Sequence, residues 1–245
     1  MRVRLMSFNI QHARDFLKAK RYGGDPIDFD LMAEAIKSQN PDIVVLNEVR
    51  NAGPCPTYKN QTKILAKKAG YEYYEFGEAI RFTKLFPYGN AILSKHPIEE
   101  FKVVHIPDPP VKDEDAYYET RCVMKCKINI NGKYLNVLGT HIGLAKSEQI
   151  NAVKTLVELI DTTSTPCALL GDFNMTPDDE KLVPIYDRLI DTAEFFDEPK
   201  LTFPSDEPNI KIDYIFVSKD VKVIYADVPD IVASDHRLHI CDIEI

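Results

Sequence analysis

The stretch Cys167-Ala-Leu-Leu-Gly-Asp-Phe-Asn174 shows how this chain is organised, because an apolar run in it ends abruptly in polar side chains. A short apolar run bounded by a turn former is typical of a strand buried on both faces. Asp172 and Asn174 stand two positions apart, so on extended backbone both point to the same side. A carboxylate beside an amide can hold and orient a water molecule. Gly171 would let the backbone approach a ligand closely, whereas the structural alternative is an Asx turn ahead of Pro177.

Two other apolar runs end in the same way. Val3–Phe8 leads into Asn9, and Ile43–Leu46 leads into Asn47 and Glu48. A buried carboxylate is costly unless it is paired or binds a metal ion. Glu48 is therefore a candidate ligand, although a solvent-facing acid at a strand end explains this segment equally well.

Histidines and acids mark the ends of three further segments. His141 follows the run Leu135–Thr140, and Asp213 opens the run that reaches Val217. Asp235 precedes His236, which puts a hard oxygen ligand beside a group that titrates near neutrality. Each of these has a plain structural explanation by itself, as a strand-end histidine or a surface-loop pair.

The remaining pattern predicts many strands, few helices and one domain over residues 1–245. Two helices are expected, near Asp30–Ser38 and near Ser147–Asp161, with Ser147 as N-cap of the second and Ile150, Val153, Val157 and Ile160 on its buried stripe. Asn131-Gly132 between two β-rich runs predicts a hairpin. The expected strands are Val3–Ile10, Asp42–Glu48, Asn90–Ser94, Arg121–Ile130, Tyr134–Thr140, Cys167–Leu170, Asp213–Val217, Val221–Ala226 and His239–Ile245.

Composition narrows the class of protein. Hydrophobic residues make up 44% and charged residues 28%, as in ordinary globular proteins. The net charge of −8 disfavours tight binding to a polyanion. No apolar stretch is long enough for a transmembrane segment. The five cysteines lack a CxxC pair, and four of them lie in strand-like runs, so a disulfide framework is not expected. We therefore expect a reducing, cytoplasmic location.

Taken together, these segments resemble the endonuclease/exonuclease/phosphatase superfamily, the deoxyribonuclease-I-like hydrolases. The matching pieces occur in family order from residue 7 to residue 236. They are SFNIQ (7–11), DIVVLNEV (42–49), YGNAILSK (88–95), ETR (119–121), GTH (139–141), GDFN (171–174), TFPS (202–205) with IDYIFVS (212–218), and SDH (234–236). The resemblance implies an α/β fold of the α+β kind, a four-layer sandwich in which helices flank two packed, mostly antiparallel β-sheets.

The resemblance also implies a role for each site residue. Glu48 looks like the principal Mg²⁺ ligand, with Asn9 beside it and Asp235 holding the same or a second ion; Mn²⁺ is a substitute. Asp172 resembles the residue that orients or deprotonates the attacking water. Asn174, His141 and Arg121 would bind phosphate oxygens. Asp213 would fix the tautomer of His236, which would act on the phosphate or as an acid–base group. Asn90 would contact the substrate.

The GTH histidine helps to choose among branches of the family. Abasic-site endonucleases usually carry asparagine there, with a longer, Trp-bearing segment before the IDY motif. This chain has His141, a short segment over residues 201–214, and no tryptophan. It therefore resembles the deoxyribonuclease, sphingomyelinase and small-phosphoester branches.

The function expected is Mg²⁺-dependent hydrolysis of a phosphomonoester or phosphodiester, with a substrate that is small or lipid-derived. One alternative is a sequence-tolerant, deoxyribonuclease-like endonuclease, although nucleic acid is not the favoured partner. An alternative of another class is a non-catalytic binding module on the same fold, for which the loss of a site residue would be the signature. The sequence leaves the oligomeric state open.

Overall fold

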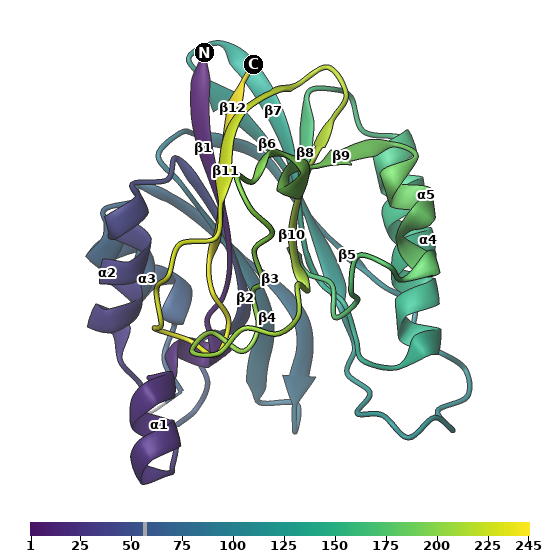
Figure 1. Ribbon diagram of the computed structural model, residues 1–245. Helices are drawn as coiled ribbons and strands as arrows, with labels where there is room; N and C mark the ends of the chain where they lie inside the picture. Colours follow the sequence, from purple (N-terminus) through teal and green to yellow (C-terminus); the bar gives the residue numbers. More distant parts are fainter. Residues whose placement is uncertain (56–57) are drawn as a thin grey trace.

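The computed structural model describes residues 1–55 and 58–245, and within them twelve strands form two six-stranded sheets (Figure 1). The first sheet has the order β11 (Lys222–Asp227), β12 (His239–Glu244), β1 (Arg2–Asn9), β2 (Ile43–Arg50), β4 (Phe86–Ser94) and β3 (Tyr73–Phe82). The second has the order β5 (Ile98–His105), β6 (Cys122–Ile130), β7 (Lys133–His141), β8 (Cys167–Asp172), β10 (Asp213–Ser218) and β9 (Leu189–Asp191).

Helices cover the outer faces of both sheets, so the predicted four-layer sandwich is confirmed. Figure 1 shows α2 (Phe29–Gln39) and α3 (Gln61–Ala69) on one outer side and α4 (Lys146–Asp161) on the other. The shorter helices are α1 (Phe16–Tyr22), α5 (Val183–Tyr186), and the 3-10 helices η1 (Gln11–Ala13), η2 (Glu180–Leu182) and η3 (Thr192–Phe195).

Three apolar clusters fill the spaces between these layers. Val45 and Ile92 of the first sheet share the central cluster with Val137 and Leu170 of the second. A second cluster joins the first sheet to α2 and α3, and a third joins the second sheet to α4 and α5. Burial of these faces is the main favourable contribution to folding, because each residue in them leaves water almost completely.

Each sheet contains one parallel pair among antiparallel neighbours. β1 runs parallel to β2 in the first sheet, and β7 runs parallel to β8 in the second. The other pairings are antiparallel, as predicted. The carboxyl ends of two parallel strands reach the same edge of a sheet, so this arrangement gathers strand-end residues together.

Local sequence signals are confirmed at two turns. Asn131 and Gly132 have φ values of 52° and 90° and close the β6–β7 hairpin, as expected for a turn that needs left-handed residues. Asn40, with φ 48° and ψ 45°, ends α2 in the left-handed conformation just before Pro41.

The start and the buried stripe of α4 differ from the prediction. Ala145, rather than Ser147, is the N-cap residue, and the Glu148 side chain accepts a hydrogen bond from the Ala145 backbone at 3.3 Å. The buried face includes Ala152 and Leu156, while Ile150 is half exposed. Val153 and Ile160 are buried and Val157 packs against the same cluster, as predicted, so only Ile150 of the predicted stripe is misplaced.

The four cysteines expected in strands, Cys122, Cys126, Cys167 and Cys241, are buried and carry free thiols. Within the described ranges, no helix has both the length and the apolar character needed to span a bilayer.

Candidate active site

Strand register brings the predicted polar residues to one edge of the two packed sheets. Asn9 pairs with Asn47 across β1 and β2, one residue before Glu48. His141 pairs with Asp172 across β7 and β8. The two parallel pairs face each other through the central core, so their four carboxyl ends converge.

Antiparallel neighbours add the remaining residues to this edge. Asp213, the first residue of β10, stands opposite Asp172, the last residue of β8. Asp235 and His236 lie in the segment that leads into β12, whose first residue pairs with Ser7 near the end of β1. Residues that lie more than 200 positions apart in the sequence, such as Asn9 and Asp235, are thus brought to the same edge.

These side chains surround a cavity of about 670 Å³. Six of the ten predicted residues line it, namely Glu48, Arg121, His141, Asp172, Asn174 and His236. Asn9 and Asp213 form hydrogen bonds with residues of this wall, and Asp235 interacts electrostatically with His236 and Glu48.

Asn90 is the predicted residue that the structure does not bring to the cavity wall. It is buried in β4, accepts a hydrogen bond from Asn47 at 2.9 Å, and its own amide nitrogen lies 3.9 Å from the thiol of Cys122. Its environment is that of a supporting residue, and a substrate contact stays a prediction.

Asp172 occupies the centre of the site. One carboxylate oxygen accepts from Asn9 Nδ2 at 3.0 Å, and the other accepts from the backbone N–H of Asn174 at 3.0 Å. Burial raises the pKa of Asp172 above its ordinary value, against the opposing charge of His236. A carboxylate with a raised pKa is suited to take a proton from water near neutral pH.

Two residues at this strand end have unusual backbone conformations. Gly171, with φ 152°, lies against the Thr140 backbone, where a Cβ would approach the carbonyl oxygen to 1.8 Å, so the neighbouring strand already requires a glycine here. Asn174 has φ 51° and is not extended. The backbone N–H of Asn174 donates to the Asp172 side chain, which forms an Asx turn, and this turn places Asn174 beside Asp172.

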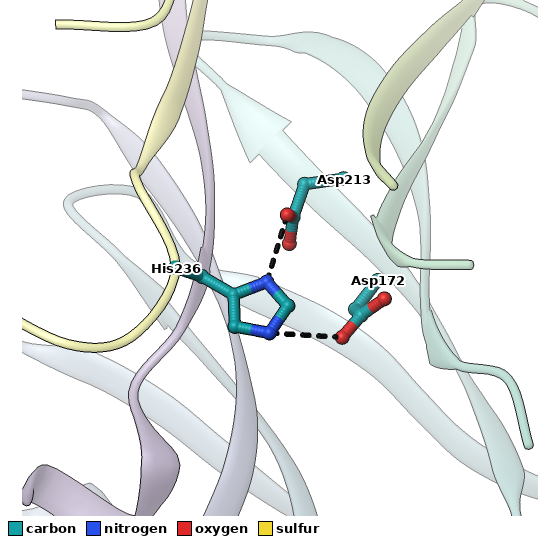
Figure 2. Close-up of side chains that lie close together, drawn as sticks. All are labelled: Asp172, Asp213 and His236. Carbon is teal, nitrogen blue, oxygen red and sulfur yellow. Dashed lines mark hydrogen bonds and ion pairs between the residues drawn. The ribbon is translucent and has the colours of Figure 1, made fainter. Parts of the chain in front are cut away.

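His236 forms an acid–imidazole pair on one side of Asp172. Figure 2 shows its ring between two carboxylates, with Nδ1 2.9 Å from Asp213 and Nε2 3.6 Å from Asp172. Burial alone would lower the pKa of His236, but the charges of Asp213 and Asp172 outweigh it and raise that pKa. The two carboxylates therefore favour the protonated ring, and its Nε2 lies beside Asp172 at the wall of the cavity.

Thr202 and Phe203 hold this pair in place. Thr202 Oγ1 accepts from the backbone N–H groups of Ile212 and Asp213, at 3.1 Å and 3.2 Å. The Phe203 ring packs on the imidazole of His236, with centroids 4.8 Å apart. Thr202 and Phe203 of the TFPS segment therefore stabilise the positions of Asp213 and His236.

His141 lies on the opposite side of Asp172, at 3.5 Å, and has a different kind of partner. Arg121 Nη1 is 3.0 Å from its Nδ1, and Asn174 Nδ2 is 3.1 Å from its Nε2. Burial, and then the charge of Arg121, lower the pKa of His141 well below its ordinary value, so the ring is neutral.

This arrangement contains one N–H donor too many. A guanidinium always donates, and Asn174 Nδ2 is fixed as the amide nitrogen by its 2.9 Å bond to the carbonyl of Ile142. A neutral imidazole offers only one acceptor nitrogen, yet both nitrogens of His141 face donors. A group of donors with too few acceptors at the wall of a cavity is suited to bind an anion.

Glu48 lies at a bulge of β2, where the register with β4 shifts between Leu46 and Val49. Its φ of 60° turns the side chain toward the cavity. One carboxylate oxygen accepts from Asn9 at 3.1 Å and the other from the Tyr88 hydroxyl at 3.0 Å.

Glu48 and Asp235 form an acidic group that has no lysine or arginine partner. Burial raises the pKa of Asp235, the charge of His236 opposes this, and the charge of Glu48 adds to it. Across residues 1–55 and 58–245, no Lys or Arg nitrogen lies within ion-pair distance of Glu48, Asp172 or Asp235. Hard oxygen ligands without a lysine or arginine partner fit a divalent cation such as Mg²⁺.

A second group of potential ligands consists of Asp172, Asp213 and His236, whose ligand atoms lie within 4.8 Å of one another. Here, however, Nδ1 of His236 is engaged by Asp213 at 2.9 Å, so a cation would have to replace that bond. The oxygen-rich group around Glu48 is the better fit for a hard cation.

Glu119 is a feature of the site that the sequence reasoning did not assign, although it stands in the quoted ETR motif. Its carboxylate lies 2.7 Å from Arg121 Nη1, and both side chains are nearly buried. Burial raises the pKa of Glu119, against the charge of Arg121. The two-residue spacing within ETR was the available signal for this pair.

Asn47, which lies in the DIVVLNEV motif, has a structural role that the sequence did not indicate. It donates to Thr140 of the second sheet at 2.8 Å and accepts from the backbone N–H of Asp172 at 3.0 Å. It therefore joins the two sheets directly beneath the cavity.

Comparison with known proteins agrees with this geometry. The model of the Endonuclease/Exonuclease/phosphatase family matches residues 6–236. The uncharacterized protein YbhP of Escherichia coli K12 is 26% identical, over 76% of this chain and 75% of its own length.

Solved structures show the same fold. An endonuclease/exonuclease/phosphatase from Bacteroides vulgatus superposes with a TM-score of 0.78 at 20% identity, covering all of this chain and 99% of that one. The mannosyl-6-phosphatase Bt3783 of Bacteroides thetaiotaomicron superposes with a TM-score of 0.76 at 19% identity, covering 99% of this chain and all of that one.

Proposed function

The chain belongs to the endonuclease/exonuclease/phosphatase family, and we propose that it is a divalent-metal-dependent phosphoesterase acting on a small or lipid-derived phosphoester. The three activities in the family name all cleave phosphoester bonds, and the chain is a hydrolase of this kind. Metal dependence, the choice of Mg²⁺ and the class of substrate are the parts that we propose. We also propose that residues 1–245 act as one catalytic domain.

The observation that carries the proposal is the division of the cavity into a side rich in N–H donors, where Glu119 balances the charge of Arg121, and an acidic side. Arg121, His141 and Asn174 present surplus N–H donors at one wall. Glu48 and, behind it, Asp235 present carboxylates without a lysine or arginine partner near another. A phosphoester anion accepts from the first group, and a divalent cation bound by the second group offsets the remaining negative charge.

Asp172, between these groups, is the proposed base. It lies within 3.6 Å of both histidines and is held by Asn9 and the Asn174 backbone. A water molecule beside its free lone pair would lose a proton to Asp172 as it attacks the phosphorus in line. General-base assistance of this kind contributes roughly 10²- to 10⁴-fold to rate.

His236 and the Arg121 group would act on the phosphoryl oxygens. The cationic His236 donates its Nε2–H to an oxygen that gains charge during attack, and Arg121 and Asn174 donate to the others. When bound at Glu48, Asn9 and Asp235, the cation supplies further positive charge at the same oxygens. The oxygen ligands favour Mg²⁺, with Mn²⁺ as a substitute.

Two further points of the proposal rest on composition and on the comparisons. Four buried free thiols are compatible with a reducing compartment, so we propose a cytoplasmic location. The net charge of −8 favours a small substrate over nucleic acid, and the fold likeness to a mannosyl-6-phosphatase supports the same choice by analogy.

A metal-supplemented screen tests the proposal. The protein is stripped with a chelator, and Mg²⁺ or Mn²⁺ is added to assays with phenyl phosphate, bis(p-nitrophenyl) phosphate, a hexose phosphate and plasmid DNA. We expect hydrolysis of a small ester that requires the added ion. Asp172→Ala should lower kcat by roughly 10³-fold, while Asp161→Ala, at a surface ion pair with Arg188, should match the wild type.

Each outcome of the screen decides between the alternatives. Failure to hydrolyse any ester with either ion would overturn the proposed function and favour a binding module. Nicking of plasmid DNA at a higher kcat/KM than that of the small esters would assign the chain to the nuclease alternative. Full activity in Asp172→Ala would show that the site is misplaced.

A further inference from the structure

A second cavity, of about 470 Å³, lies beside the candidate active site. It is lined by the loop that follows η3, including Phe196, Pro199 and Leu201, and by the segment Asn209–Lys211 that leads into β10. None of the site residues assigned above belongs to its wall.

The two cavities share part of their walls. Thr176 and Ile210 line both of them, so each of these side chains has the active-site cavity on one side and the second cavity on the other. Thr176 follows Asn174 by two residues, and Ile210 precedes Asp213 by three. A substrate whose phosphoryl group lies at Asn174 therefore needs to extend only past Thr176 to enter the second cavity.

The cations in the second cavity are already neutralised. Lys211 is buried and forms an ion pair with Asp191 at 2.9 Å. Lys200 lies 3.2 Å from Asp227 and 3.7 Å from Glu198. Because these charges have partners within the chain, the cavity provides no free cation for a second phosphate or a carboxylate.

Apolar side chains make up much of the remaining wall. Phe196, Pro177, Pro199, Leu201 and Ile210 all line the cavity, and Asn209 is the one amide side chain among its lining residues. The polar lining residues are Thr176, Asn209, the exposed acids Asp197 and Glu198, and the two paired lysines, but most of the exposed surface of the wall is apolar. Such a surface suits an alkyl chain or a ring better than a sugar with many hydroxyl groups. An alkyl chain or an aromatic ring would gain from leaving water here.

We propose that the second cavity binds the alcohol part of the substrate, and that the substrate is a phosphoester of a bulky, uncharged and mainly apolar alcohol. The inference rests on the proposed function, because it assumes that the phosphoryl group is held in the first cavity. It adds a specificity subsite formed by Leu201, Phe196 and Ile210.

The test compares esters that differ only in the length of the alcohol. Ethyl and octyl phosphate, each also as its methyl diester, are assayed with the metal-loaded protein below the micelle concentration of the octyl esters. A buried methylene group favours binding by up to about fourfold, so kcat/KM should rise at least about tenfold from ethyl to octyl. A hexose phosphate should be a poorer substrate than octyl phosphate.

Two variants locate the effect in the cavity. Leu201→Asp places a charge in the wall, and Ala193→Trp fills the space with a ring. Each should lower the octyl-to-ethyl ratio of kcat/KM by at least about fivefold, since the buried apolar area is lost. The matched control is Leu17→Asp, at a half-exposed leucine of α1 that lines neither cavity, and it should keep the wild-type ratio.

The outcomes separate this inference from the proposed function. If ethyl phosphate is hydrolysed but chain length has no effect, or if both folded variants keep the wild-type ratio, the subsite is wrong and the phosphoesterase stands. If no ester is hydrolysed, the proposed function fails. Calorimetric binding of octyl phosphate then tests the subsite by itself. The subsite is supported if the wild type binds octyl phosphate and Leu201→Asp or Ala193→Trp abolishes binding, and it is wrong otherwise.

Discussion

Two histidines flank Asp172 at nearly equal distances, yet their surroundings give them opposite character. His236 lies 3.6 Å from Asp172 on the side of β10 and β12, and His141 lies 3.5 Å away on the side of β6 and β7. The second partner of His236 is the carboxylate of Asp213, whereas that of His141 is the guanidinium of Arg121. The partner, rather than burial, separates them, because both rings are almost completely buried.

Because their partners differ, the two histidines are suited to different functions. A carboxylate partner raises the pKa of His236 and orients its ring, as an acid–imidazole pair does in other hydrolases. Burial lowers the pKa of His141, and its arginine partner lowers it further and adds a donor to the wall. The first side is suited to proton donation and charge stabilisation, and the second to anion binding. Exchanging or weakening the partners tests this division.

The largest effect is expected from Asp213→Asn. The amide keeps the shape but removes the negative charge that raises the pKa of His236, so the ring loses its charge and its fixed tautomer. We expect kcat/KM to fall by roughly 10³-fold. The measurement is steady-state kinetics, with His236→Gln and the double variant alongside. Independent, additive losses in the double variant would argue against an Asp213–His236 unit.

A smaller effect is expected from Arg121→Lys on the other side of Asp172. Lysine keeps the charge but cannot present a planar fork to both His141 and a phosphoryl oxygen. We expect a loss of about 10²-fold in kcat/KM, in the range found for a single lost donor, together with weaker inhibition by inorganic phosphate. Arg188→Lys, at a surface pair with Asp161, is the matched control. Unchanged inhibition by phosphate would remove Arg121 from the anion site.

The smallest effect is expected from Glu119→Gln, one step further from the substrate. Glu119 positions Arg121 and has no role in proton transfer, so its removal should cost about tenfold in kcat/KM. Phosphate inhibition should weaken in parallel, and the Glu119→Gln, Arg121→Lys double variant should be no worse than Arg121→Lys. Glu78→Gln, at the exposed pair with Arg81, controls for loss of a Glu–Arg contact. A lower Tm with unchanged phosphate inhibition would show a purely structural role.

Prediction of the fold from the sequence succeeded for the central strands and for the edge strand β11, and it failed at the other three edges. β8 is buried throughout and β2 is buried from Ile43 to Asn47, so both appear as continuous apolar runs. β3, β5 and β9 lie at sheet edges, and β3 and β5 are half exposed and carry charged residues, which weakens the alternation. The short helices α1, α3 and α5 were missed as well.

The candidate site was predictable where chemistry and spacing coincide. Asp172, Asn174 and His236 follow or precede strands directly, and strand ends are visible in the sequence. The ETR spacing was a signal for Glu119, but the sequence did not show that Glu119 pairs with Arg121 or that Thr202 binds the backbone at Asp213, because these contacts depend on how loops pack. The roles assigned to the ten site residues stay predictions until the variants are measured.

The sequence by itself determined which functional groups stand at which strand ends, because a strand shows its length and burial in a pattern of period two or in an apolar run. The tertiary structure decided which of these groups meet. It joined His236 to an acid and His141 to an arginine, and it placed an apolar cavity beyond Thr176 and Ile210. Such pairings depend on sheet register and sheet packing, which bring together residues far apart in the chain and which no local pattern encodes.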